Sequence, residues 1–79
     1  MRPLIVELRR TCYLCPEQWE GKLDTGEAVF ARERHDVWRV EVDGVVIDRG
    51  SLNEGGVGSA YEALLKWFDI APDAEKEDE

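Results

Sequence analysis

Three arginines occupy alternate positions in two neighbouring runs of the sequence and form its first candidate for a chemical site. Arg32 and Arg34 lie in one alternating run, and Arg39 lies in the next. If the two residues between the runs form a turn, Arg32 and Arg39 face each other across antiparallel strands. Guanidinium groups bind phosphate and carboxylate through paired hydrogen bonds, and Phe30 adds a stacking surface on the same face. These residues predict an anion-binding site.

An ordinary salt-bridge lattice on a solvated sheet face is the alternative for these arginines. Like charges directly opposite each other across strands are unfavourable. Glu41 and Asp48 are expected on the same face, where they would relieve the repulsion, and exposed sheet faces commonly mix both signs of charge.

A glycine-rich segment that leads into a helix is the second candidate. Gly56, Gly58 and Ser59 stand where a helix is expected to begin, and the free amides of a helix N-terminus attract phosphate. No lysine follows at the spacing of a nucleotide-hydrolysing loop. The alternative is a flexible connection between the sheet and the helix.

The two cysteines and the single histidine are the remaining reactive side chains. Cys12 and Cys15 have the C-x-x-C spacing that supplies two thiolates to zinc. A second such pair is absent from the sequence, so no metal site is predicted, and two reduced, half-buried cysteines are the alternative. His35 is expected to be a turn residue, because no nucleophile stands in a legible arrangement with it.

The elements that must position these side chains follow from periodicity and turn residues. Alternation of apolar and polar residues predicts strands, and a serine capping box followed by helical spacing predicts one helix that ends at Pro72. The expected strands are residues 4–13, 19–23, 28–34, 37–42 and one that starts at residue 45, with the helix over residues 59–71. The stripe of the helix that is expected to face the sheet contains Tyr61, Leu64, Leu65 and Phe68.

Two turns set the expected register of the central strands. The His35-Asp36 turn pairs Arg32 with Arg39, and the Asp43-Gly44 turn pairs Val42 with Val45, Val40 with Ile47 and Arg39 with Asp48. The expected core face contains Val29, Ala31, Trp38, Val40, Val42, Val45 and Ile47. The expected wet face contains Phe30, Arg32, Arg34, Arg39, Glu41, Val46 and Asp48.

These elements predict an α+β fold in which an antiparallel sheet of four or five strands carries one C-terminal helix on one face. Residues 1–72 are expected to form a single small domain, and residues 73–79 an acidic tail. The chain has 79 residues, which leaves room for one modest core and a shallow site.

Charge and hydropathy restrict the partners. The formal net charge is -8, and half of it lies in residues 73–79. An acidic chain argues against nucleic acid, which requires basic patches. No apolar stretch approaches the length of a membrane span, so the protein is expected to be cytoplasmic and to act away from membranes.

A segment in the first half of the chain carries a resemblance. It reads Cys12-x-x-Cys15-Pro16-x-Gln18-Trp19-x-Gly21, followed by Leu23-Asp24-x-Gly26 and an aromatic-Arg strand. Over residues 12–40 this pattern resembles short uncharacterised proteins of actinobacteria and their phages. The resemblance implies a stand-alone accessory protein that acts by binding, and it carries no activity with it.

Two functions are expected from these observations. The first is a non-enzymatic protein that sequesters an anionic, nucleotide-like small molecule, with homo-oligomerisation as an option for completing the site. The alternative is an acidic interaction module that inhibits a host protein by charge mimicry or through Trp67 as an anchor. Catalysis and cofactors are not predicted, because no nucleophile–base pair or set of four metal ligands can be assembled.

Overall fold

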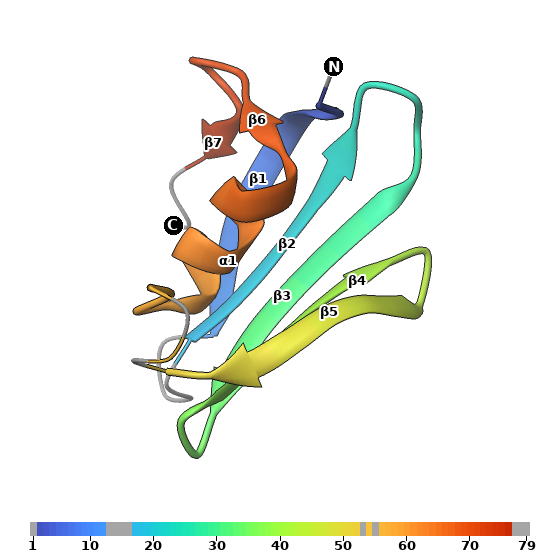
Figure 1. Ribbon diagram of the computed structural model, residues 1–79. Coiled ribbons are helices and arrows are strands. Elements are labelled where there is room, and N and C mark those ends of the chain that lie inside the picture. The colour runs from blue at the N-terminus through green and yellow to red at the C-terminus, as the bar shows by residue number, and fades with distance from the viewer. Residues whose placement is uncertain (1, 13–16, 53, 55, 77–79) are drawn as a thin grey trace.

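The fold is known from a computed structural model that describes residues 2–12, 17–52, 54 and 56–76. The described residues form one helix and seven strands (Figure 1). They are β1 (Leu4–Cys12), β2 (Glu17–Leu23), β3 (Ala28–Arg34), β4 (Val37–Val42), β5 (Val45–Ser51), α1 (Ala60–Trp67), β6 (Asp69–Ile70) and β7 (Glu75–Lys76).

The strands form one mixed sheet in the order β5-β4-β3-β2-β1-β6, and β7 also pairs with β1. The first five strands are antiparallel neighbours, whereas β6 and β7 run parallel to β1. The α+β class is confirmed. The expectation of a purely antiparallel sheet of four or five strands was wrong, because the chain after the helix returns to the sheet.

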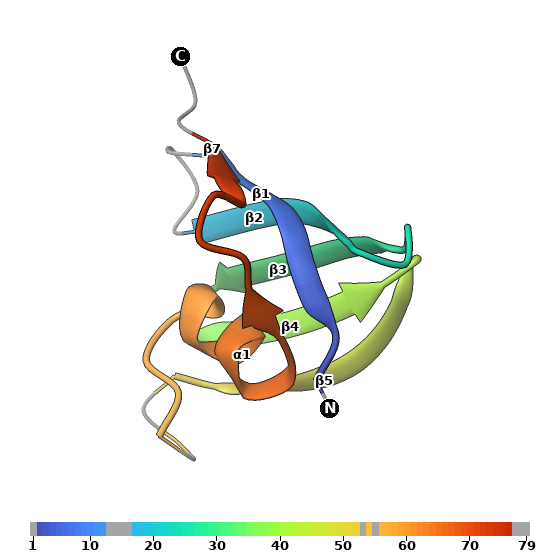
Figure 2. The same cartoon turned by 90° about the horizontal axis from the view of Figure 1, so that it is seen from above.

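Helix α1 packs against β2, β3 and β4 on one face of the sheet (Figures 1 and 2). Its buried residues are Ala60, Ala63 and Leu64, and the small side chains of the two alanines allow close approach of the helix. The expected stripe was partly wrong, since Leu65 is 43% exposed. The residues of the wider core are Ile5, Leu8, Leu23, Val29, Ala31, Trp38, Val40, Val57, Ala60, Ala63, Leu64, Phe68 and Ala74.

The helix ends four residues earlier than periodicity predicts. Phe68 takes an extended conformation while its amide still donates to the carbonyl of Leu64. The guanidinium of Arg2 donates to the carbonyls of Leu65 and Phe68, which satisfies acceptors that every helix end leaves open. The amide of Asp69 then donates to the Pro3 carbonyl, so pairing with the N-terminal strand replaces the last helical turn.

Part of the expected acidic tail belongs to the sheet. Ala74 is fully buried, and its carbonyl accepts a 2.8 Å hydrogen bond from the amide of Leu8. Glu75 pairs with Leu8 across the parallel β1–β7 ladder, and its carboxylate accepts a hydrogen bond from the Tyr61 hydroxyl at 2.8 Å. Residues 74–76 therefore close the β1 edge of the sheet.

The Asp43-Gly44 turn has positive φ at both residues, as expected, but the register of β5 changes three residues beyond it. Val42 pairs with Val45, whereas Val40 pairs with Asp48. One additional residue, Ile47, is accommodated by a β-bulge, which reverses the faces of the residues that follow. The expected pairings of Val40 with Ile47 and of Arg39 with Asp48 were wrong.

The bulge turns Asp48 away from the predicted wet face and towards the helix. Its carboxylate accepts hydrogen bonds from Lys66 Nζ at 3.1 Å and from Trp67 Nε1 at 2.8 Å. Val45 and Ile47, which were expected in the core, are 64% and 38% exposed. The Asp48 carboxylate, which accepts from two donors of α1, thus joins the helix to the edge strand where an apolar contact was predicted.

We expect Asp48→Asn to lower the free energy of unfolding by about 1 kcal/mol at neutral pH, which lowers Tm by about 4–8 °C. Burial by itself raises the pKa of Asp48, but hydrogen bonds from Trp67 and Lys66, the charge of Lys66 and the amide of Arg49 lower it below its usual value of 3.8. The ionised carboxylate therefore stabilises the fold above pH 3.8, and this stabilisation is lost as the pH falls through the lowered pKa.

Thermal unfolding at several pH values checks this prediction. The difference between the wild-type protein and Asp48→Asn should be full at pH 6 and should shrink below pH 3.8. Asp24→Asn, at an exposed position beside the β2–β3 turn, is the matched control and should unfold like the wild type. A difference for Asp48→Asn that persists unchanged at pH 2 would contradict the linkage.

Candidate functional site

The candidate site lies on the sheet face opposite α1, where arginines from three neighbouring strands align. Arg32 of β3 pairs with Arg39 of β4, which confirms the predicted register. Because of the bulge, Arg39 also pairs with Arg49 of β5. Adjacent strands lie about 4.8 Å apart, so the three side chains start from one row that crosses half of the sheet. We call Arg32, Arg34, Arg39 and Arg49 the arginine face.

A shallow hollow of about 280 Å³ opens over the arginine face. The residues that line it are Arg32, Arg34, Val37, Trp38, Arg39 and Arg49. None of these lining residues, which all belong to the described part of the chain, is acidic. The hollow is therefore a concentration of positive charge on a chain whose net charge is -8.

Only one member of the arginine face has an acidic partner within residues 2–12, 17–52, 54 and 56–76. Arg39 Nε lies 2.7 Å from Glu41 Oε2, and the guanidinium carbon of Arg39 lies 6.0 Å from the centre of the Phe30 ring. Arg32 Nε is buried and has no hydrogen-bond partner among those residues. Like charges directly across a ladder are destabilising, and here a third arginine adds to the repulsion.

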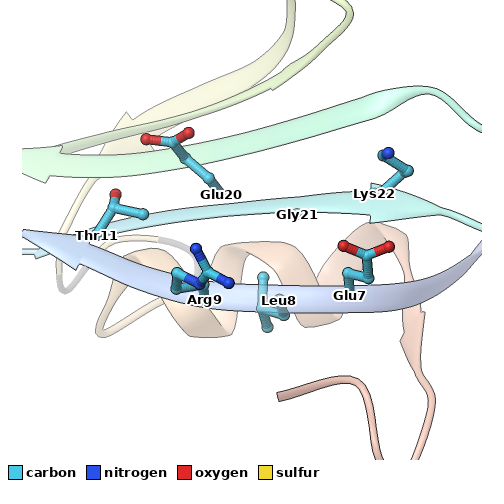
Figure 3. Close-up of a pocket in the computed structure, with 7 residues that line it drawn as sticks. All are labelled: Glu7, Leu8, Arg9, Thr11, Glu20, Gly21 and Lys22. Atoms are coloured by element: carbon cyan, nitrogen blue, oxygen red, sulfur yellow. The ribbon is translucent and has the colours of Figure 1, made fainter. Parts of the chain in front are cut away.

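The other end of the same sheet face shows how ordinary exposed charges are arranged. On β1 and β2, Glu7 pairs with Lys22 and Arg9 pairs with Glu20, so opposite charges stand across the strands. These residues line a second hollow of about 200 Å³ (Figure 3). Its charges balance, which is typical of a solvated lattice, whereas those of the arginine face do not.

The glycine-rich segment is not brought to the arginine face. Gly56, Gly58 and Ser59 precede α1, which covers the opposite face of the sheet. Ser59 Oγ accepts from the Glu62 amide at 3.1 Å, and the Glu62 carboxylate accepts from the Gly58 amide at 2.9 Å. The predicted capping arrangement is thus present and uses these groups within the chain.

An acidic side chain from β2 occupies the start of the helix. Glu17 accepts hydrogen bonds from the amides of Ala60 at 2.9 Å and Tyr61 at 3.1 Å. Its carboxylate also accepts from Trp19 Nε1 at 2.6 Å. A carboxylate is the charge that a helix N-terminus favours, so the protein supplies its own anion where the sequence predicted an external one. We therefore leave Gly56, Gly58 and Ser59 out of the proposed site.

Trp67, His35 and the cysteine pair are the remaining residues that the sequence singled out. Trp67 is 42% exposed, and its indole N–H is bonded to Asp48, which holds the ring beside β5. His35 lies in the β3–β4 turn with φ of 55°, as expected. Cys12 ends β1, and Cys15 lies outside the described residues, so the C-x-x-C pair stays a prediction. Among the residues that the structure places, no three His, Cys, Asp or Glu side chains are grouped to hold a metal.

Arg49 is the site residue that the sequence analysis missed. Unbroken alternation after the Asp43-Gly44 turn puts Arg49 on the core side, and only the bulge moves it to the arginine face. Gly50 is the available signal, because glycine inside a strand often marks a bulge or a close approach. A Cβ at Gly50 would lie 2.7 Å from Trp38 Cζ2, which places residue 50 on the core face and Arg49 on the other.

The helix of the described chain is too short and too polar to span a membrane. Comparison with other proteins finds no matching protein family, no matching curated protein and no matching solved structure. The resemblance to short actinobacterial and phage proteins therefore stays a prediction, and the site has to be interpreted from its own chemistry.

Proposed function

We propose that this protein is a non-enzymatic binder that sequesters an anionic small molecule on the arginine face. The observation that carries the proposal is the row of Arg32, Arg39 and Arg49 across three adjacent strands, which lines a hollow without an acidic lining residue. A bound anion would neutralise the repulsion among Arg32, Arg39 and Arg49.

Recognition on this surface depends on direct contact. The chain as a whole carries -8, so its overall field repels anions and does not steer them towards the site. Guanidinium groups compensate at short range, because each one can give two parallel hydrogen bonds to a phosphate or carboxylate. The proposal therefore predicts an affinity that depends on individual arginines more than on net charge.

Isothermal titration of the full chain tests the proposal with inorganic phosphate, pyrophosphate, citrate and nucleoside monophosphates and diphosphates as probes. We expect at least one probe to bind, and Arg32→Ala and Arg49→Ala each to weaken binding by roughly tenfold, the loss of one charge-assisted hydrogen-bond pair. The thermal unfolding of each variant is measured in parallel to show that it is folded.

Arg9→Ala is the matched control, because Arg9 lies on the same sheet face but stands opposite Glu20. Its affinity for the probe should equal that of the wild type. The proposal is wrong if no member of the panel binds, or if Arg9→Ala weakens binding as much as Arg32→Ala does.

The alternative function, an acidic module that inhibits a host protein, stays a prediction. The exposed fractions of Leu65 and Trp67, 43% and 42%, are the observation in its favour. Capture of a protein partner by the wild type but not by a Trp67→Ala variant would support it, and equal capture by both would contradict the role of Trp67 as an anchor.

A further inference from the structure

A second row of side chains runs directly beside the arginine row on the same face of the sheet. Phe30 of β3 pairs with Glu20 of β2 on one side and with Glu41 of β4 on the other. An aromatic ring thus stands between two carboxylates. Residues two apart along a strand share a face and lie about 7 Å apart, so this row is displaced by about 7 Å from the arginine row.

The two rows would contact chemically different parts of one ligand. The arginine row offers only hydrogen-bond donors and positive charge. The Glu20–Phe30–Glu41 row offers an apolar ring and carboxylate acceptors, which would repel an anion that extended over them. A simple anion such as phosphate or citrate can use the first row alone.

Arg39 links the two rows. Its Nε lies 2.7 Å from Glu41 Oε2, and its guanidinium carbon lies 6.0 Å from the centre of the Phe30 ring. This ion pair engages Nε and leaves the two terminal nitrogens outside it. The planar guanidinium and the ring beneath it are both surfaces on which a flat heterocycle stacks.

Glu20 supplies the acceptor on the far side of the ring. It is exposed, and one oxygen of its carboxylate, Oε2, accepts a 3.3 Å hydrogen bond from Gln18 Nε2. This hydrogen bond orients the Glu20 side chain, and its carboxylate remains accessible from solvent. A ligand that lies over Phe30 therefore meets an acceptor on either side of its ring.

We propose that the ligand of the arginine face is a nucleoside phosphate, an inference that rests on the proposed function. The phosphate binds the row of Arg32, Arg39 and Arg49, and the base stacks over Phe30 and Arg39. The N–H groups of the base donate to Glu20 and Glu41. A nucleotide carries these parts at the separation that the two rows provide, with its anion at one end and a flat donor-bearing ring at the other.

The test compares three probes that share one anionic group: a nucleoside 5′-monophosphate, ribose 5-phosphate and inorganic phosphate, each titrated into the full chain. We expect the nucleotide to bind roughly tenfold more tightly than ribose 5-phosphate, in line with the contribution of one stacked base. The readout is the ratio of the affinities for the nucleotide and for ribose 5-phosphate. Both ligands bind the arginine row through the same phosphate, so a change that affects only this row leaves the ratio unchanged.

Phe30→Leu and Glu41→Gln should each lower this ratio towards one, and Phe30→Leu should leave the affinity for ribose 5-phosphate unchanged. Val46→Ala, next to Glu41 in the same row, is the matched control and should keep the wild-type ratio. Glu41→Gln serves as the second variant if Phe30→Leu does not fold.

The outcomes separate the two proposals. Equal affinity for all three probes, with loss of binding in Arg32→Ala, would overturn the nucleotide inference and leave the anion-binding function standing. A wild-type ratio in both Phe30→Leu and Glu41→Gln would overturn it as well. Binding of none of these three probes would overturn the nucleotide inference, and the function on which it rests would also be wrong if pyrophosphate, citrate and the nucleoside diphosphates fail to bind as well.

Discussion

Gly21→Ala is expected to destabilise the fold by roughly 3 kcal/mol or more, the upper range for overpacking a closed site. A methyl group at residue 21 would overlap the backbone carbonyl oxygen of Glu7 and would lie 3.2 Å from Leu8 Cδ1. The obstacle is backbone of the adjoining strand, which pairs with β2 on both sides of this position. It cannot move without breaking the ladder between β1 and β2.

The close approach at Gly21 has a cause in β1. The register between β1 and β2 shifts between Ile5 and Glu7, and a β-bulge bends its strand and increases the local twist. Chemical denaturation should show a lower midpoint for Gly21→Ala with little change in the slope.

Gly58→Ala is the control for Gly21→Ala, because a Cβ there would meet only the flexible end of Glu62 at 3.4 Å. It should change the free energy of unfolding by less than about 1 kcal/mol. If Gly21→Ala proved as stable as Gly58→Ala, the close approach of β1 to residue 21 would be wrong.

Glu17→Ala is expected to cost roughly 2–3 kcal/mol, because it leaves part-buried donors without an acceptor. The amide of Ala60 is part of a fully buried residue, and Glu17 is the side chain that accepts from it and from Tyr61. The same carboxylate accepts from Trp19 Nε1, so three donors lose their acceptor at once.

An added anion should restore part of the stability that Glu17→Ala loses. With the carboxylate removed, the N-terminus of α1 presents free amides and a positive dipole end, which attract sulfate and phosphate. We expect sulfate to raise the Tm of Glu17→Ala more than that of the wild type, with equal ionic strength maintained by chloride. Glu17→Gln keeps one acceptor oxygen and should lose less stability and respond less to sulfate.

A sulfate response that is equal in the wild type and in Glu17→Ala would contradict this account of the helix start.

The two anion sites that the sequence predicts differ in whether the chain already satisfies them. The glycine-rich site is satisfied by Glu17, Ser59 and Glu62 within the chain. The arginine face, on the opposite side of the sheet, is the site that we propose for a ligand.

The pairing of β3 with β4 could be predicted from the sequence because its determinants are local. The turn at His35 and Asp36 requires two residues with positive φ, and the alternation on both sides admits one register. That register places Arg32 opposite Arg39. The capping of α1 by Ser59 could be predicted for the same reason, since donor and acceptor are three residues apart.

The bulge in β5, the early end of α1 and the return of residues 69–76 to β1 could not be predicted in this way. Each depends on partners that are distant in sequence. Asp48 faces the helix because Lys66 and Trp67 are there to bond it. Phe68 leaves the helix to be buried, and the amide of Asp69 then bonds the carbonyl of Pro3.

The sequence by itself determined three of the four arginines of the site, the strands that carry them and the aromatic ring beside them, because alternation and turn chemistry act over a few residues. Tertiary structure decided that Arg49 joins Arg32 and Arg39, that Asp48 leaves them, and that Glu17 closes the competing site at the helix. The reason is that one inserted residue exchanges the two faces of a strand, and only contacts between the strand and the helix determine where that residue is accommodated.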